Sequence, residues 1–152
     1  MRHDNDQWID QRIRWRAGKH GLPTHQTFLF PNLPDTHRAM LISIAEDHGV
    51  GMPVLAFIDG SRWTLVGTQR IVSCHDDEMV ICDLTAISDV DIDEDYRTDA
   101  NPSESNYLKI FKKEEHEPAM IWAPRGSECF ALWNILLMLS KLKSCVEADQ
   151  YE

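Results

Sequence analysis

The most constraining feature of this sequence is the stretch from Pro53 to Trp122, where short β-type segments alternate with turn signals. The first segment, Val54–Ile58, ends at Asp59-Gly60, a dipeptide typical of tight hairpin turns. The segments that follow are Arg62–Cys74, Met79–Cys82, Ile87–Ile92, Tyr107–Phe111 and Ala119–Trp122. Because short turns join antiparallel neighbours, this stretch predicts an antiparallel sheet of six to seven strands.

Helix signals precede the strand-rich stretch. Polar residues and an imperfect apolar stripe predict a helix over Asp4–Gly18. A second helix is predicted to begin at a cap formed by Asp35 or Thr36 and to end at His48. Gly49 follows in the position where a helix commonly ends with a left-handed residue.

One long helix follows the strands and sets the fold class. It is predicted over Ser127–Ser144, with Ser127 as its N-cap. The proline-rich Leu22–Pro34 is predicted to be an extended connection, and Asp93–Ser105 a loop. The chain has 152 residues, which suits one domain at residues 51–145 with a helical extension at residues 1–50 that packs on the core. These elements predict an α+β protein.

Two neighbouring segments carry a resemblance to a known family. They are Arg62–Cys74 (RWTLVGTQRIVSC) and, after a polar turn, Met79–Ile92 (MVICDLTAISDVDI). Together with a single C-terminal helix, they resemble the bacterial pleckstrin-homology-like (PH-like) domains over Pro53–Lys143. The resemblance implies a partly open antiparallel barrel capped by that helix. It also implies a binding module, for phosphoinositides in some members and for peptides or proteins in others.

The loop between the first two strands bears on the ligand. Members of the family that bind lipid use basic residues there, whereas Asp59–Arg62 holds one Arg and an acid. We therefore expect protein contacts rather than phosphoinositide binding. The alternative is a small-molecule or lipid carrier that uses the space between the sheet and the C-terminal helix.

Negative charge is concentrated in the middle of the chain. The net charge is −10, and residues 51–105 hold 12 Asp and Glu against three Lys and Arg. An acidic surface steers basic partners towards it and disfavours nucleic acid and membranes, so one interpretation is a surface that meets a basic protein partner. The other interpretation is a solvated loop and strand edge. The residues predicted to meet the partner are Asp76, Asp77, Asp89, Asp91, Asp93 and Asp95.

A narrower hypothesis is an acidic immunity-type or adaptor protein.

The acidic run itself does not predict a calcium loop beginning at Asp89. Such a loop needs Gly at its sixth position and Glu at its twelfth, where Glu94 and Ala100 stand.

Basic residues gather in the first predicted helix. Arg12, Arg14, Arg16, Lys19 and His20 lie near Trp8 and Trp15. One interpretation is contact with nucleic acid or an acidic lipid. The other, which we favour, is a solvated face that offsets the acidic middle of the same molecule.

No sequence motif predicts catalysis, a cofactor or a metal ion. Cys74 and His75 are neighbours on a strand, so their side chains point to opposite faces and cannot act as a nucleophile and its base. A disulfide between Cys74 and Cys82 across the hairpin is the alternative to free thiols. The N-terminus is polar, and we expect a cytoplasmic, non-enzymatic protein.

The C-terminal helix is more apolar than one sheet face requires. Its predicted second surface contains Phe130, Trp133, Leu137 and Met138. Either the N-terminal segment covers this surface through Trp8, Ile13, Phe28 or Phe30, or a second copy of the chain packs there as a homodimer. We favour the first arrangement.

Overall fold

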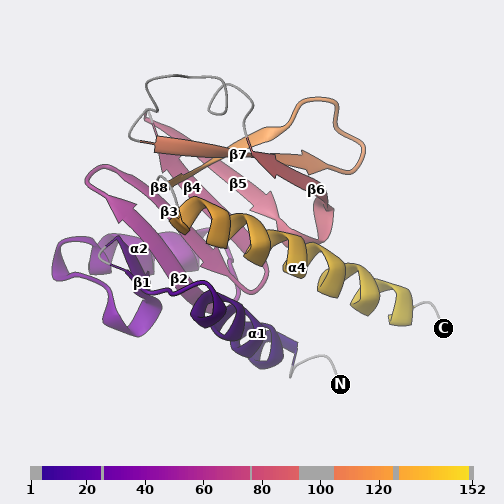
Figure 1. Ribbon diagram of the computed structural model, residues 1–152, viewed down its shortest axis with the longest axis horizontal. Coiled ribbons are helices and arrows are strands. Elements are labelled where there is room, and N and C mark those ends of the chain that lie inside the picture. The colour runs from indigo at the N-terminus through magenta and orange to yellow at the C-terminus, as the bar shows by residue number, and fades with distance from the viewer. Residues whose placement is uncertain (1–4, 25, 76, 93–104, 125–126, 151–152) are drawn as a thin grey trace.

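The computed structural model describes residues 5–24, 26–75, 77–92, 105–124 and 127–150 (Figure 1). The α-helices are α1 (Asn5–Lys19), α2 (Asp35–Asp47) and α4 (Ser127–Gln150). Two short 3-10 helices are η2 (Phe30–Asn32) and η3 (Leu84–Ala86). The strands are β1 (Thr27–Leu29), β2 (Pro53–Asp59), β3 (Arg62–Gly67), β4 (Arg70–His75), β5 (Glu78–Asp83), β6 (Ile87–Ile92), β7 (Ser105–Lys112) and β8 (Ala119–Pro124).

The strands form two antiparallel sheets. The larger sheet has the order β1-β2-β3-β4-β5, and the smaller has the order β6-β7-β8. Figure 1 shows the smaller sheet beside the larger one, and α4 packs against β6, β7 and β8 of the smaller sheet. The predicted α+β class, with antiparallel strands and a long C-terminal helix, is confirmed.

Buried polar side chains join the two sheets. The Ser73 hydroxyl on β4 accepts a hydrogen bond from the Trp122 backbone N–H on β8 at 3.0 Å. The Thr64 hydroxyl on β3 donates to the Trp122 carbonyl. Both backbone groups of a fully buried Trp are therefore satisfied by side chains of the opposite sheet.

The predicted single strand Arg62–Cys74 is instead the hairpin β3–β4. At Gly67, a Cβ atom would overlap the Val50 carbonyl, so the chain passes close to the loop after α2. The next two residues bond to this loop, since Thr68 N–H donates to the Met52 carbonyl and Gln69 N–H to the Val50 carbonyl. These contacts turn the chain, and a local strand pattern could not reveal them.

The helices lie close to their predicted positions. The cap of α2 is Pro34 rather than Asp35 or Thr36, and its carbonyl accepts hydrogen bonds from the N–H groups of His37 and Arg38. Gly49 has φ +59°, as predicted for the residue beyond the helix end. The ends of two further segments can be compared with their predicted positions. The last helix, α4, continues to Gln150, beyond its predicted end at Ser144. The predicted loop at 93–105 lies outside the described residues, except for Ser105, where β7 begins.

Two hydrophobic clusters hold the layers together. The main core joins both sheets to α1 and α4, and the second lies between α2 and the outer face of the larger sheet. Ile13 is buried in the main core, where α1 packs against α4. Phe28 and Phe30 do not cover α4, because β1 pairs with β2 and places Phe28 opposite Ala56, on the α2 side. Trp8 does not cover it either and is 45% exposed.

None of the described helices combines the length and the apolar character needed to cross a bilayer.

Candidate functional site

The acidic residues predicted to meet a partner come from two sheets. Asp77 is exposed in the turn between β4 and β5, with φ +63°. Asp89 is exposed on β6, and Asp91 is half-buried there, opposite Lys109 of β7. Asp76, Asp93 and Asp95 lie outside the described residues. The described acids are therefore divided between a hairpin turn and a strand of the smaller sheet.

The apolar residues predicted for the second surface of α4 have different surroundings. Phe130 is 51% exposed, while Met138 is buried at 8% exposure. Trp133 is half-buried, and its indole Nε1 donates a hydrogen bond to the Val90 carbonyl of β6 at 2.8 Å. Leu137, one turn further along α4, is also half-buried. The four residues thus do not form one exposed surface.

Asp89 and Leu137, predicted for two different surfaces, meet in one groove. It lies between β6 and α4, which run side by side (Figure 1). Its volume of about 640 Å³ falls within the usual range of ligand sites. We call this the β6–α4 groove, and it is lined by Ile87, Ser88, Asp89, Lys113, Leu137, Ser140 and Lys141.

Apolar side chains and charged groups are arranged separately in the β6–α4 groove. Ile87 is buried beneath the groove, and the half-buried Leu137 offers apolar surface to it, so the floor of the groove is apolar. Asp89, Lys113 and Lys141 are exposed and bring charge of both signs to its rim. Such an arrangement suits an extended protein segment, in which side chains of different character alternate.

The backbone groups of β6 are not all open to a ligand. In the described smaller sheet β6 is the outer strand, and an outer strand offers backbone groups to a ligand. At Val90 these groups are occupied, since the N–H donates to the Asp89 carboxylate at 2.9 Å and the carbonyl accepts from Trp133. The β6–β7 register shifts between Ile87 and Asp89, so the pairing is irregular at the end of the strand beside the groove.

The sequence did not indicate that Lys113, Ser140 and Lys141 would share a site with β6. Lys113 follows β7, and the other two lie on α4. Their assembly depends on how the helix packs across the sheet, and no local pattern reports that packing. Of the lining residues, Asp89 was selected from the sequence for its charge, and Leu137 for the apolar excess of its helix.

Cys74 and Cys82 do not form an activated site. Cys74 packs in the second cluster, whereas His75 donates from Nε2 to the Met120 carbonyl at 3.1 Å in the space between the sheets. The two side chains lie on opposite faces of β4, as predicted. Burial, followed by the charge of Asp77, raises the pKa of Cys74. Burial also raises the pKa of Cys82 to about 11. A reactive thiol needs the opposite shift.

The alternative disulfide between Cys74 and Cys82 is wrong. Both thiols are free. In the β4–β5 register Cys74 lies opposite Met79, and Cys82 lies opposite Ile71. Cys74 belongs to the second cluster and Cys82 to the main core, so the sheet separates them. Within the described residues, no three His, Cys, Asp or Glu side chains are grouped as a metal site would require.

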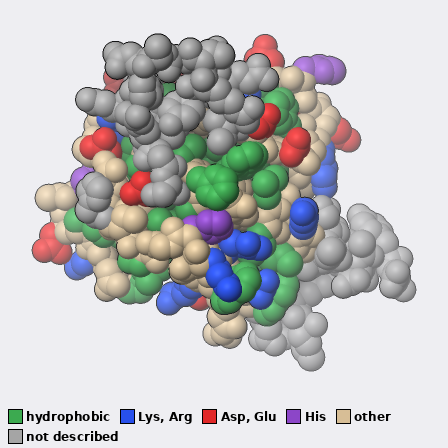
Figure 2. Space-filling model, in the orientation of Figure 1, with side chains coloured by type: hydrophobic (Ala, Val, Ile, Leu, Met, Phe, Trp, Pro, Cys, Tyr) green, Lys and Arg blue, Asp and Glu red, His purple; other side chains and the backbone are tan. Residues whose placement is uncertain are grey.

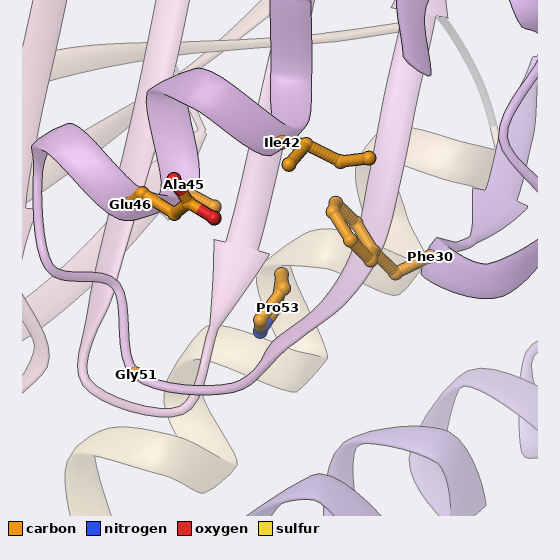
Figure 3. Close-up of a pocket in the computed structure, with 6 residues that line it drawn as sticks. All are labelled: Phe30, Ile42, Ala45, Glu46, Gly51 and Pro53. Atoms are coloured by element: carbon orange, nitrogen blue, oxygen red, sulfur yellow. The ribbon is translucent and has the colours of Figure 1, made fainter. Parts of the chain in front are cut away.

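A second hollow lies at the end of α2. It is lined by Phe30, Ile42, Ala45, Glu46, Gly51 and Pro53 (Figure 3). Figure 3 shows the side chains of Ile42 and Phe30 next to each other on one side of it and those of Ala45 and Glu46 on the other, with Pro53 between Phe30 and Gly51. Its volume is about 210 Å³, below the usual range for small-molecule sites.

Apolar side chains of α4 fill the space between the sheets and this helix. Leu132, Ile135, Leu136 and Leu139 are fully buried in the main core. A carrier that uses this space stays a prediction.

No protein-family model and no curated protein matches this sequence. Crystal structures that are similar to it include the following two. One is a pleckstrin homology domain from Shewanella amazonensis, with 13% identity over 72% of this chain and 92% of that one, and a TM-score of 0.49. The other is a DUF1696-family protein with a pleckstrin-homology domain from Shewanella loihica, with 13% identity over 66% of this chain and 92% of that one, and a TM-score of 0.45. The chain is thus similar to bacterial PH-domain structures, the family that its strand pattern resembles.

Proposed function

We propose that this protein is a non-catalytic binding module that holds a segment of a protein partner in the β6–α4 groove. The observation that carries the proposal is the groove itself, with an apolar floor at Ile87 and Leu137 and charged groups around it. A protein segment gains affinity from apolar contacts at the centre of such a site and orientation from charges at the rim.

The charge at Asp89 favours a basic side chain in the bound segment. Asp89 is exposed and forms no ion pair among the residues that the structure describes. The net charge of −10 adds a long-range attraction for a basic partner. An acidic immunity-type or adaptor protein, which covers a basic partner, is the narrower form of this proposal.

Photo-crosslinking in cells that make the full chain tests the site. A benzoylphenylalanine placed at Ser140, which lines the groove, is expected to capture a partner. The same group at Asp47, exposed on α2, is the matched control and is expected not to capture it. Equal capture from both positions contradicts a docking site in the groove.

Affinity measurements with the captured partner then test the chemistry. Asp89→Lys is expected to slow association, and Leu137→Ala to speed dissociation, each by about threefold to tenfold. Asp47→Lys makes the same charge change on α2 and should have no effect. Raising the salt concentration should weaken binding to the unmodified chain more than binding to Asp89→Lys. Unchanged rates for both groove variants contradict the proposal.

A further inference from the structure

The outward face of α1 carries cations around an exposed aromatic ring. The helix buries Ile9, Ile13 and Ala17, which recur every four residues, against the main core. Among the residues at the intervening positions, Trp15 and Lys19 are exposed, whereas Arg12 and Arg16 are half-buried at the flank of the buried face. These four residues form a cluster that we call the α1 stripe.

Three cations of the α1 stripe converge on Trp15. The guanidinium carbons of Arg12 and Arg16 lie 4.8 and 5.3 Å from the ring centroid. The ammonium of Lys19 lies 5.1 Å from it. Attraction to the ring offsets the repulsion among the three charges and holds them together, and 46% of Trp15 remains exposed.

These cations have no carboxylate partner in the part of the chain that the structure describes. Their neighbour Arg14 differs, since it pairs with Asp10 at 3.1 Å. The Nε atoms of Arg12 and Arg16 are also buried without a hydrogen-bond partner. The stripe is therefore a preassembled positive group that lacks its counter-charge, on a protein whose net charge is −10.

Apolar surface adjoins the α1 stripe on its α4 side. The ring of His20 meets Phe130 edge to face at 5.7 Å, and Phe130 is 51% exposed. Figure 2 shows Lys and Arg side chains gathered over α1, next to a histidine and a group of hydrophobic side chains. Arg16 also lines an open groove of about 260 Å³ with Leu137, Met138, Leu142, Asn134 and Lys141 of α4.

We propose that the α1 stripe and Phe130 form a second docking surface, which binds an acidic protein segment carrying at least one apolar side chain. Carboxylates of the segment would take the place of the missing counter-charge at Arg12, Arg16 and Lys19. Its apolar side chain would contact Phe130. Trp and Arg are the residues most enriched where protein interfaces gain their affinity. The α1 stripe and Phe130 are not part of the lining of the β6–α4 groove, although the open groove beside Arg16 shares Leu137 and Lys141 with it.

A protein segment fits this surface better than nucleic acid or a membrane does. The cations already lie over the Trp15 ring, so the ring is not free to stack on a base. Three cations neutralise few phosphates, and each contributes only about 1 kcal/mol at an anionic membrane. The net charge of −10 repels an extended anionic surface such as a membrane or a nucleic acid. A short acidic segment would contact only the α1 stripe.

A labelled peptide of alternating Glu and Leu is the test ligand for the full chain, with fluorescence anisotropy at low ionic strength as the measurement. Arg16→Gln is expected to weaken binding about threefold, and Trp15→Ala about tenfold. Each has a matched control on the same helix. Arg14→Gln removes an equal charge outside the stripe, and Trp8→Ala removes an equally exposed indole with no cation over its ring among the described contacts. Neither control should weaken binding.

Thermal unfolding of each variant verifies that the fold is kept. Asp89→Asn, in the β6–α4 groove, should leave peptide binding unchanged, so the two proposals fail separately. Equal losses for Arg14→Gln and Arg16→Gln overturn the inference. It is also overturned if the peptide does not bind, while an oligothymidine or vesicles containing phosphatidylserine bind and depend on Arg16 and Trp15.

Discussion

The indole of Trp133 fastens α4 to the edge of β6, through a hydrogen bond of 2.8 Å from Nε1 to the Val90 carbonyl. Val90 itself is buried, and its N–H is taken by the Asp89 carboxylate. This part of the outer strand is therefore closed to further pairing. The open β6–α4 groove begins beside it, where Leu137 replaces Trp133 one turn along the helix.

Removing this hydrogen bond should destabilise the protein. In Trp133→Phe the ring is largely kept, but the Val90 carbonyl loses its partner in a partly buried place. The expected loss in the free energy of unfolding is about 1–2 kcal/mol, measured by urea denaturation. Phe130→Leu alters an exposed aromatic residue on the same helix and should cost less than about 0.5 kcal/mol. Equal losses for the two variants would show that the bond to Val90 does not matter.

Two glycine substitutions should have opposite effects. Gly67→Ala places a methyl group against the Val50 carbonyl, a backbone atom that cannot move aside freely. A loss of about 2–4 kcal/mol is expected. Gly18→Ala is the control, because no atom lies within 4 Å of the new methyl and the residue is helical. It should raise stability by up to about 1 kcal/mol. Thermal denaturation measures both, and a stabilising Gly67→Ala would contradict the close approach of Val50.

The buried link between the sheets can be tested at Ser73. Ser73→Ala removes the acceptor of the Trp122 N–H in a fully buried place, so unfolding should become easier by about 1–3 kcal/mol. Ser88→Ala removes an exposed hydroxyl that bonds to the Phe111 carbonyl and serves as the control. Its expected cost is below about 1 kcal/mol. Hydrogen exchange at the Trp122 amide should accelerate in Ser73→Ala alone.

The buried thiol of Cys82 should make stability fall at alkaline pH. Burial raises its pKa from 9.0 to about 11 in the folded protein. Below about pH 9 both states hold the proton, so this group changes nothing. As the pH rises from about 9 to 11, the unfolded thiol ionises first and the folded state loses stability, by about 1 kcal/mol at pH 10.

The matched measurement compares urea unfolding of the unmodified chain and Cys82→Ala from pH 8 to alkaline pH. The variant starts from a lower stability, because it loses buried contacts, but its curve should fall less steeply. Parallel curves for the two proteins would show that the Cys82 thiol does not contribute to the pH dependence.

The sequence identified individual residues of the candidate sites, but it did not show which of them lie together. Asp89 and Leu137 were both selected from the sequence, one for charge on a strand and the other for excess apolar character on a helix. The sequence assigned them to different surfaces, because strand and helix periods say which face a residue is on and not which faces meet. The α1 stripe was visible as a basic cluster, yet its convergence on Trp15 depends on side-chain positions.

The sequence by itself determined the elements and their order. Turn chemistry such as Asp59-Gly60, where Gly60 has φ +62°, and apolar periodicity act over a few residues, so they can be read locally. Tertiary structure decided what depends on residues far apart. The approach of Gly67 to Val50 divided one predicted strand in two, and the pairing of β1 with β2 carried Phe28 to the side of α2. The packing of α4 across β6 created the groove, since a helix and a strand share a site only once the core between them has formed.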